Sequence, residues 1–323
     1  MYSNQTNLPT PIAVWLAHDT YDRTEAGLSA TSLLKPIRQV ILTQRVPAGE
    51  GIVDVNGLIK SRIGTAIHDA IERAWLDERI EDTLRSLGVS EKMIRRVKVN
   101  PTGELVGPVI PIYLELRSSK EVLGTKITGK FDFVEYGHLT DFKTTGTYAY
   151  TSGNKDEDYI MQGSIYRWLN PDIITDDYMS ICFIFTDWQS TRYLSDPKNY
   201  PPNQIVTREF RLHSAASVQA FVEERVKALN HYQDKPEAEL PECTDKELWR
   251  KEDTYKYYKN PEKTTRSTAN FATMIEAQQR YVEDGAVGVI KTVKGGVSAC
   301  KYCSAFTMCT QKDRLIESGD LKL

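Results

Sequence analysis

The chain has 323 residues, 40% of them hydrophobic and 26% charged, with a formal net charge of −3. This composition is ordinary for a globular protein and excludes disordered and collagen-like classes. No apolar run approaches the roughly 18 residues that cross a bilayer, and the N-terminus shows no signal-peptide pattern, so we expect a cytoplasmic protein without a membrane partner. A net charge of −3 excludes a protein that binds nucleic acid through an overall basic surface. It does not exclude binding through a local basic groove.

The first part of the chain is expected to be helical. Residues 27–47 predict a helix capped by Ser29 or Thr31, and Leu58 to Leu87 shows a second helical pattern. The apolar side chains of this second pattern form one stripe, made of Ile63, Ile67, Ile71, Ala74 and Trp75.

From Val109 to Thr144 the apolar residues recur at every second position, which is typical of strands. Three sequential, antiparallel strands are predicted there, namely "IYLEL", "TKITGKFDFVEY" and "HLTDFKTT". The elements predicted next are a helix from Glu157 to Leu169, a buried strand over 180–188, a strand "QIVTREFRL" and an amphipathic helix "SVQAFVEERVKALNHY".

The order of these elements predicts an α/β fold in three parts. A helical region over residues 1–56 precedes the core, which we expect over residues 57–235. A polar segment and a group of cysteines then define a C-terminal subdomain over residues 236–323.

The segment "TGKFDFVEYGHLTDFKTT" carries three charged residues in an otherwise apolar hairpin. With Gly137-His138 as a two-residue turn, Asp132 pairs with Lys143, and Asp141 lies on the same face. Two carboxylates beside one ammonium form a hard oxygen site suited to Mg²⁺ or Mn²⁺, where the lysine can orient a water molecule. The alternative is an exposed salt bridge, which contributes about 0–1 kcal/mol. The opposite face, expected to pack in a core, carries Phe131, Phe133 and Phe142.

Two helices add polar residues at helical spacing. Gly64, His68 and Glu72 follow one another at intervals of four, so they share one face of the second helix. Gln162 and Tyr166 share a face in the same way after the hairpin. A single histidine at this position is more often a hydrogen-bonded core residue than a metal ligand, so neither helix assigns a function by itself.

Three of the five cysteines are spaced as Cys300-x₂-Cys303-x₅-Cys309. They are too few for a disulfide scaffold. Their spacing allows either buried structural thiols or a metal site, because tetrahedral zinc sites often contain a C-x₂-C turn. A metal site needs a fourth ligand, and Cys243 in the polar "LPECTDKELW" is a better candidate than Cys182, which lies within an apolar strand.

The segment "WRKEDTYKYYKNPEKTTRS" mixes basic and aromatic residues. Phosphate contacts and base stacking are the two ways in which such residues bind a DNA strand. The candidates are Lys256, Tyr257, Tyr258 and Lys259. A solvated surface loop explains the same composition.

Four motifs, in this order, resemble the PD-(D/E)XK nucleases of the RecB type. They are Gly64-x₃-His68, Gly129-x₂-Asp132, Asp141-x-Lys143 and Gln162-x₃-Tyr166. The matched region covers about residues 27–170. Within the α/β class, the resemblance implies a restriction-endonuclease-like mixed sheet flanked by helices.

The resemblance also implies a role for each motif residue. The implied metal ligands are His68, Asp132, Asp141 and the main-chain carbonyl of Phe142. The other implied roles are activation of the attacking water by Lys143, flanking contacts by Gln162 and Tyr166, and support of His68 by Glu72. The implied ion is Mg²⁺ or Mn²⁺, and the imidazole ligand favours Mn²⁺.

Iron–sulfur nucleases of the RecB type share the C-x₂-C-x₅-C spacing, so the resemblance implies a four-iron–four-sulfur (4Fe-4S) cluster, with Zn²⁺ as the alternative. The cysteine that the best-known members carry near the first helix is missing from "LLKPIRQ". The implied ligands are therefore Cys243, Cys300, Cys303 and Cys309.

The activity implied by the resemblance is metal-dependent hydrolysis of DNA by an exonuclease. The chain resembles phage-borne and CRISPR-associated nucleases that act in recombination, replication or DNA processing. The sequence contains no G-x-x-x-x-G-K-[ST] motif, so ATP-driven unwinding would require a separate helicase or recombination protein. Two alternatives are a DNA-binding scaffold that does not cut and an RNA-processing nuclease.

Overall fold

The computed structural model describes residues 2–18, 27–47 and 53–323. Within these ranges, no helix combines the length and the apolar character that crossing a membrane requires.

The chain forms two compact units. Unit 1 comprises Met1–Leu34 and Gly51–Lys227, and unit 2 comprises Lys35–Glu50 and Ala228–Leu323. A short segment from the early part of the sequence therefore belongs to the C-terminal unit.

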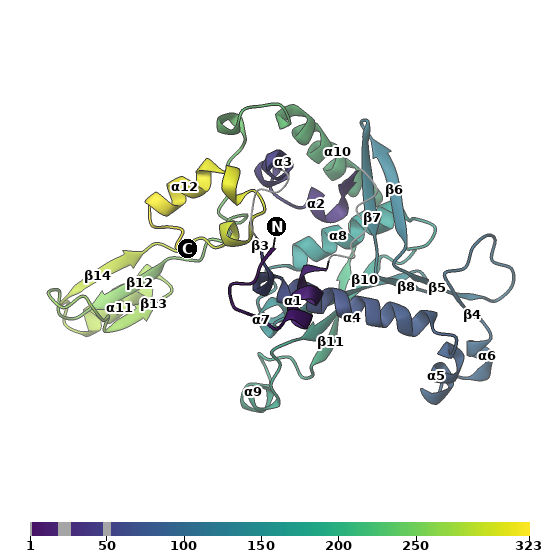
Figure 1. Cartoon of the computed structure of the whole chain (residues 1–323). Coiled ribbons are helices and arrows are strands. Elements are labelled where there is room, and N and C mark those ends of the chain that lie inside the picture. The colour runs from purple at the N-terminus through teal and green to yellow at the C-terminus, as the bar shows by residue number, and fades with distance from the viewer. Residues whose placement is uncertain (1, 19–26, 48–52) are drawn as a thin grey trace. The chain divides into compact units, whose positions relative to one another are not determined.

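Unit 1 contains a mixed six-stranded sheet in the order β11-β10-β9-β8-β5-β4 (Figure 1). Its strands are β4 (Val97–Val99), β5 (Ile110–Leu114), β8 (Phe133–Glu135), β9 (His138–Thr145), β10 (Tyr178–Phe185) and β11 (Ile205–Arg211). β9 runs parallel to β10 and β4 runs parallel to β5, whereas the other neighbours are antiparallel. This mixed sheet with flanking helices confirms the predicted α/β class.

Two smaller sheets belong to the same unit. One consists of β2 (Leu28–Ser29), β7 (Thr125–Lys130) and β6 (Arg117–Val122), with β7 in the centre. The other pairs β1 (Tyr2–Ser3) with β3 (Val53–Asp54).

The helices of unit 1 are α1 (Thr10–Ala17), α2 (Ala30–Leu33), η1 (Val55–Leu58), α4 (Ile59–Leu76), α5 (Ile80–Ser86), α6 (Glu91–Ile94), α7 (Thr147–Ser152), α8 (Asp156–Leu169) and α9 (Ser190–Ser195). α10 (Ala215–Tyr232) begins in unit 1 and ends in unit 2. The predicted helix at α8, the buried strand β10, the strand β11 and the amphipathic helix α10 are confirmed.

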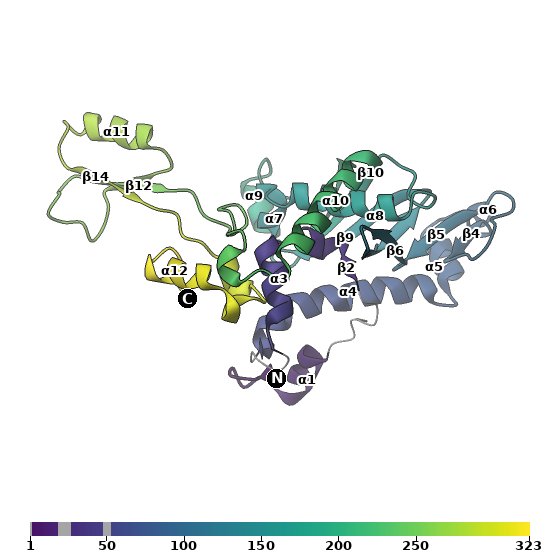
Figure 2. The same ribbon diagram turned by 90° about the horizontal axis from the view of Figure 1, so that it is seen from above.

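Helices cover both faces of the large sheet. On one face, Ile165 of α8 and the apolar side of α10 pack with Phe183 of β10 in the main core. On the other face, Trp75 of α4 packs against Phe133, beside the half-buried Phe142. Figures 1 and 2 together show α4 and α8 on opposite sides of β9. Both faces of the β8–β9 hairpin are therefore shielded from solvent.

Strands β5 to β8 form one long, bent hairpin. The register that pairs Leu114 with Phe133 in the large sheet continues unchanged through β6 and β7 in the small sheet. At the bend, the N–H of Glu115 donates to the carbonyl of Asp132 at 3.1 Å. The predicted strand "TKITGKFDFVEY" is therefore two strands that separate at Asp132, and "RSSKEV" is a strand that the sequence pattern did not indicate.

The turn between β8 and β9 lies one residue earlier than predicted. Tyr136 and Gly137 form it with φ values of 51° and 80°. Two successive positive φ angles define the turn that matches the twist of a two-residue hairpin, and glycine adopts this conformation without strain. Glu135 consequently pairs with His138.

This correction changes the partner of Asp132. When the observed register is continued, Asp132 lies opposite Asp141 rather than opposite Lys143. The partner changes by two positions, so Asp141 and Lys143 keep the shared face that was predicted. Phe131 packs in the main core, apart from the two other phenylalanines of its predicted face, because the chain bends at Asp132.

Residues 27–47 contain two helices rather than the single helix predicted. α2 begins after Ser29, whose hydroxyl accepts a hydrogen bond from the Ser32 N–H at 3.1 Å, so Ser29 is the cap. Pro36 ends this helical segment, because proline lacks the N–H that a helix interior needs. α3 (Ile37–Arg45) then begins in unit 2.

The second predicted helix, Leu58 to Leu87, is also divided. α4 ends at Leu76, and Asp77 accepts a hydrogen bond from the N–H of Arg79 at 2.9 Å. This local turn competes with helix continuation, so α5 starts as a separate helix.

Unit 2 combines α3 with the C-terminal part of the chain. Its other elements are η2 (Glu237–Glu239), β12 (Thr254–Tyr258), β13 (Ala269–Phe271), α11 (Met274–Glu283), β14 (Val289–Val293), η3 (Ala299–Tyr302), η4 (Phe306–Met308) and α12 (Thr310–Glu317). The strands form an antiparallel sheet in the order β13-β12-β14. A separate small core joins Ile41 and Leu42 of α3 to Leu240 and Ala305.

Candidate active site

Three carboxylates meet where the bent hairpin passes from the large sheet to the small one. Glu115 lies in the bend after β5, Asp132 lies opposite it before β8, and Asp141 belongs to β9. Asp132 Oδ2 accepts a hydrogen bond from the N–H of Phe142 at 2.8 Å, which holds Asp132 against β9. The fold therefore brings together one carboxylate from each of three neighbouring chain segments.

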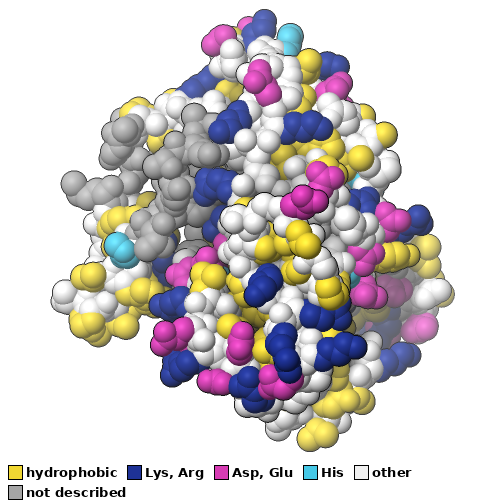
Figure 3. Space-filling model, turned by 90° about the vertical axis from the view of Figure 1, so that its right-hand side faces the viewer, with side chains coloured by type: hydrophobic (Ala, Val, Ile, Leu, Met, Phe, Trp, Pro, Cys, Tyr) yellow, Lys and Arg dark blue, Asp and Glu magenta, His cyan; other side chains and the backbone are white. Residues whose placement is uncertain are grey.

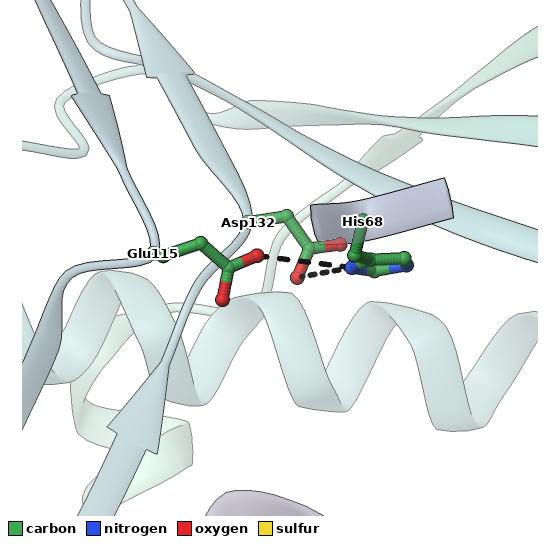
Figure 4. A group of neighbouring side chains, drawn as sticks. All are labelled: His68, Glu115 and Asp132. Carbon is green, nitrogen blue, oxygen red and sulfur yellow. Dashed lines mark ion pairs between the residues drawn. The ribbon is translucent and has the colours of Figure 1, made fainter. Parts of the chain in front are cut away.

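His68 of α4 approaches this row of carboxylates. Its Nδ1 lies 3.6 Å from Asp132 Oδ1 and 3.8 Å from Glu115 Oε1. Its Nε2 lies 3.0 Å from the carbonyl oxygen of Phe142. His68, Glu115 and Asp132 offer ligand atoms that all lie within 4.8 Å of one another, and Figure 4 shows the three side chains pointing toward one another.

The sequence pattern did not reveal Glu115 as a site residue. Its φ of 50° is uncommon for a residue with a side chain, and such backbone strain tends to occur at functional positions. The signal that could have revealed it is Gly124, because a glycine favours a tight turn there. In the structure, Leu123 and Gly124 form this turn with positive φ angles. Counting outward from that turn pairs Glu115 with Asp132. Glu115 also forms an ion pair with Lys130.

Asp141 and Lys143 form an ion pair at the buried side of β9. Asp141 is 2% exposed, and its Oδ2 lies 2.5 Å from Lys143 Nζ. Gln162 of α8 bridges the pair, because its Nε2 lies 3.4 Å from Asp141 Oδ1 and its Oε1 lies 3.4 Å from Lys143 Nζ. Asp141 Oδ2 is thus buried, and the Lys143 ammonium is the cation that compensates its charge.

Tyr166 fixes the position of Gln162. The Nε2 of Gln162 donates to the Tyr166 hydroxyl at 2.8 Å, and the Tyr166 ring is buried. Gly129 of β7 allows this close packing, since an added Cβ there would lie 2.6 Å from Leu169 and 3.0 Å from Tyr166. The glycine of the second motif therefore has a steric role in placing α8 beside the site.

The site carries more negative charge than its own cations neutralise. Burial and then the charge of Asp141 raise the pKa of Asp132 to about 7. Burial alone would lower the pKa of Lys143, but Asp141 and Asp132 outweigh it and raise that pKa. Glu115 chiefly raises the pKa of His68. Each shift has the direction expected where carboxylates crowd together away from water.

The donor set fits a hard divalent cation. Carboxylate and main-chain carbonyl oxygens are the ligands that Mg²⁺ and Mn²⁺ prefer, and an imidazole is acceptable to Mn²⁺. The crowding of carboxylates that raises the pKa of Asp132 is the feature that a cation would relieve. His68, Glu115 and Asp132 are the residues whose ligand atoms lie close enough together to hold an ion, and the Phe142 carbonyl lies beside His68.

Two other residues of α4 do not join this group. Glu72 is half-buried and forms no hydrogen bond or ion pair with the site within the described residues. Gly64 lies in open space, with no atom within 4 Å of an added Cβ. The structure thus gives Glu72 no contact for the predicted supporting role.

The four cysteines of the predicted cluster gather in unit 2. Cys243 and Cys300 pack in one small apolar core, and Cys303 and Cys309 pack against the core that contains α3. Cys182 lies on β10 of unit 1 instead. All five thiols are free of disulfides. The structure therefore places Cys243, and not Cys182, near the C-terminal cysteines.

The thiols of this group influence one another. Burial raises the pKa of Cys243 to about 12, and Glu247, Cys309 and Cys303 add to the effect. Burial also raises the pKa of Cys300. Burial without a cation disfavours the thiolate, so a metal at these sulfurs would have to supply the missing charge.

Arg38 of α3 lies against this group and is 3% exposed. Its Nε donates to Cys309 Sγ at 3.3 Å, and its Nη1 donates to the Leu240 carbonyl at 3.2 Å. It also forms an ion pair with Glu237. A buried guanidinium needs such partners, and here one of them is a candidate metal ligand.

The residues predicted to stack on DNA bases are not available for stacking. Tyr257 is completely buried and donates its hydroxyl hydrogen to the Val287 carbonyl at 2.7 Å. Tyr258 is 7% exposed. Lys259 is exposed and lies 3.9 Å from Asp284, so of the four predicted residues only the lysines present polar groups to solvent.

The surface shown in Figure 3 mixes both signs of charge. Lys and Arg side chains alternate with Asp and Glu over this face, without a broad field of one sign. This face therefore gives no indication of a nucleic-acid surface by charge.

Comparison with known proteins gives limited information. No family model and no curated protein matches the chain. A solved structure named SSO0001 is similar, with a TM-score of 0.40 and 14% identity, over 68% of this chain and 84% of that one. A phage-related exonuclease from Haemophilus somnus 129PT is similar over 67% of this chain and 97% of that one, with a TM-score of 0.30 and 16% identity. Both TM-scores are below 0.5, so neither likeness decides the family or the activity.

Proposed function

We propose that the chain is a metal-dependent deoxyribonuclease of the PD-(D/E)XK superfamily, RecB type, and that it acts as an exonuclease. The observation that supports this proposal is the meeting of Asp132, Asp141 and Lys143 with Gln162 at one place in unit 1. Three of the four motifs, from separate segments of the chain, contribute to that arrangement. In a simple surface salt bridge, the carboxylate and the ammonium need no third group. Here the amide of Gln162 contacts both the buried Asp141 carboxylate and the Lys143 ammonium.

A divalent cation held by His68, Glu115, Asp132, Asp141 and the Phe142 carbonyl would lower the pKa of water and neutralise charge on a phosphate. The chain itself contributes orientation. The ammonium of Lys143 is held by Asp141 and Gln162, so it is fixed in position to donate a hydrogen bond to the attacking water.

Gln162 and Tyr166 keep this geometry rigid. The hydrogen bond between them is 2.8 Å long, and the buried Tyr166 ring anchors it to the core. Loss of either side chain would leave Lys143 free to change rotamer. Positioning of this kind accounts for a large part of catalysis when two reactants must meet.

The proposal includes a preference for the metal. An imidazole among oxygen ligands raises the affinity for Mn²⁺ relative to Mg²⁺. We therefore expect activity with both ions and a higher rate with Mn²⁺ at equal concentration.

We also propose that Cys243, Cys300, Cys303 and Cys309 hold an iron–sulfur cluster. The four thiols all lie in unit 2 and are free of disulfides. The C-x₂-C-x₅-C spacing of the last three is the one that the resemblance associates with such a cluster. Zn²⁺ is the alternative metal.

The test is an anaerobic nuclease assay on end-labelled single- and double-stranded DNA with Mg²⁺, Mn²⁺ or EDTA. The variants are Lys143→Gln and Asp141→Asn, and the control is Lys98→Gln, an exposed lysine on β4. We expect cleavage only with metal, a loss of at least about 100-fold in both site variants, and an unchanged rate in the control. Release of mononucleotides from an end identifies an exonuclease.

Other results would contradict the proposal in distinct ways. Tight DNA binding without cleavage under either metal would identify a binding scaffold. Faster cleavage of a matched RNA strand would identify an RNA-processing enzyme. Full activity of Lys143→Gln would place the chemistry elsewhere. A separate helicase or recombination partner remains part of the proposal for unwinding duplex substrates.

A further inference from the structure

The small sheet of unit 2 has two faces with different surroundings. Tyr257 of β12 points toward α11, where its ring centre lies 6.3 Å from that of Tyr281. Figure 2 shows α11 lying over one side of the sheet. Successive side chains of a strand alternate between faces, so Lys256 points to the side away from α11.

A row of polar residues crosses this second face. In the register of the sheet, Lys256 of β12 lies opposite Asn270 of β13 on one side and opposite Lys291 of β14 on the other. Directly opposed residues share a face, so all three side chains project together. Asn270 and Lys291 are exposed, and Lys256 is half-buried.

The two lysines are an unfavourable pair in the isolated protein. Like charges directly opposite each other in a sheet destabilise it. In the described part of the chain, neither Lys256 nor Lys291 forms a salt bridge. Several other cations of this unit do have acidic partners, as in the pairs Lys259–Asp284, Arg280–Asp284, Lys294–Asp320 and Arg250–Asp245.

The rest of the face lacks acidic groups. The rows beside the lysines consist of Thr254 with Val293 and of Tyr258 with Val289. The Lys291 ammonium lies over the Tyr258 ring, 5.7 Å from its centre, and the tyrosine is only 7% exposed. The face therefore offers positive charge and hydrogen-bond donors, but no open aromatic surface for base stacking.

We propose that this face binds the sugar–phosphate backbone of DNA through Lys256 and Lys291. Two ammonium groups without an acidic partner in the described residues, on neighbouring strands, are complementary to successive phosphates, and Asn270 adds an amide donor beside them. The choice of DNA rather than another polyanion rests on the proposed nuclease function. The contact depends on phosphate charge, so it adds affinity without sequence preference.

The test measures binding separately from cleavage. A fluorescein-labelled single-stranded oligonucleotide is titrated in EDTA over a series of salt concentrations, with fluorescence anisotropy as the readout. The variant is the double substitution Lys256→Gln and Lys291→Gln. The control removes the same charge from two exposed lysines of unit 2 away from this face, Lys246→Gln and Lys322→Gln.

We expect the slope of log affinity against log salt to decrease by about 1.4 in magnitude in the face variant, which is about 0.7 for each lost contact. Binding near 0.1 M salt should weaken about tenfold. Equal slopes in the wild type and the face variant would overturn the proposal, as would an equal loss in the control. Thermal melting of each variant verifies that it is folded.

Two further results separate this proposal from the proposed nuclease function. Lysine-dependent binding in EDTA together with no cleavage under any metal would retain the face and reject the nuclease. Cleavage with an unchanged salt slope would retain the nuclease and reject the face. Tighter lysine-dependent binding to heparin or to RNA than to DNA would overturn DNA as the occupant.

Discussion

At the scale of single residues, Asp132 lies between two other carboxylates and is largely shielded from water. These surroundings raise its pKa to about 7. We predict that Asp132→Asn raises the melting temperature of the metal-free protein, because the amide removes a charge that burial and Asp141 disfavour. We also expect Mn²⁺ to raise the melting temperature of the wild type, and the same change should abolish this rise. Thermal melting in EDTA and in Mn²⁺ measures both effects.

The sign of the pH dependence follows from the same shift. Between the ordinary pKa of an aspartate and about 7, the folded metal-free protein holds a proton that the unfolded chain has lost. Its stability therefore falls as pH rises through this range, and the gain from Asp132→Asn should be larger at pH 8 than at pH 6. Asp176→Asn is a control of opposite sign, because His138 lowers the pKa of Asp176. A gain from Asp176→Asn equal to that from Asp132→Asn would contradict the explanation.

Arg38 is a second residue with a specific expectation. Arg38→Met removes the donor to Cys309 Sγ and leaves Glu237 without its cation. We predict a loss of about 1–3 kcal/mol in the free energy of unfolding, which is the usual cost of an unsatisfied, largely buried polar group. Arg38→Lys keeps the charge but not the planar donor geometry, so it should recover only part of this loss. Denaturant unfolding of all three proteins tests the order.

At the scale of elements, two motif glycines are expected to behave in opposite ways. An added Cβ at Gly129 would lie 2.6 Å from Leu169, so Gly129→Ala should push α8 away from β7. We predict a destabilisation of about 1–3 kcal/mol and lower nuclease activity, since Tyr166 and Gln162 would move with α8. Denaturant unfolding and the nuclease assay measure the two effects.

Gly64→Ala is the matched control for this substitution. No atom lies within 4 Å of an added Cβ, and the residue is inside α4. Alanine should therefore stabilise the helix by up to about 1 kcal/mol. If both alanine variants were equally stable, the close packing of β7 on α8 would not be the reason for Gly129.

The errors of the sequence-based prediction also belong to the scale of elements. The alternation of apolar residues located β5 and β7 to β9, but it missed β6 and did not determine where one strand bends into another sheet. Glu115 was missed for this reason, because only the continuous ladder through β5 to β8 places it opposite Asp132. The turn at Tyr136 and Gly137 was displaced by one residue because a single glycine is compatible with either position of the turn.

At the scale of the whole molecule, the chain is divided into two units, and the five cysteines are distributed unequally between these units. Cys243 lies in unit 2 with the other three candidate ligands, whereas Cys182 lies on β10 of unit 1. We predict that Cys243→Ser lowers the bound iron and the visible absorbance of anaerobically purified protein and destabilises unit 2. Cys182→Ser should leave both quantities unchanged. Metal analysis and absorbance spectra of the two variants test this assignment.

Removal of the proposed cluster provides a second test at this scale. A chelator acting under oxidising conditions should destabilise unit 2, because metal–thiolate bonds contribute directly to folding. Hydrogen exchange should increase in α12 and η3 and stay unchanged in β9 and β10. Zinc in place of iron in the purified protein, with the same protection pattern, would support the alternative metal.

The sequence by itself determined the fold class and the main helices and strands around the large sheet, and it singled out the motif residues Asp132, Asp141, Lys143, Gln162 and Tyr166. These features depend on local periodicity and on residue type, which a linear sequence contains. Only the tertiary structure decided the register of the hairpin, the place of Glu115 and the burial of Tyr257 and Tyr258. Those features depend on contacts between segments distant in sequence, because pairing and burial are decided by what packs against a strand rather than by the strand itself.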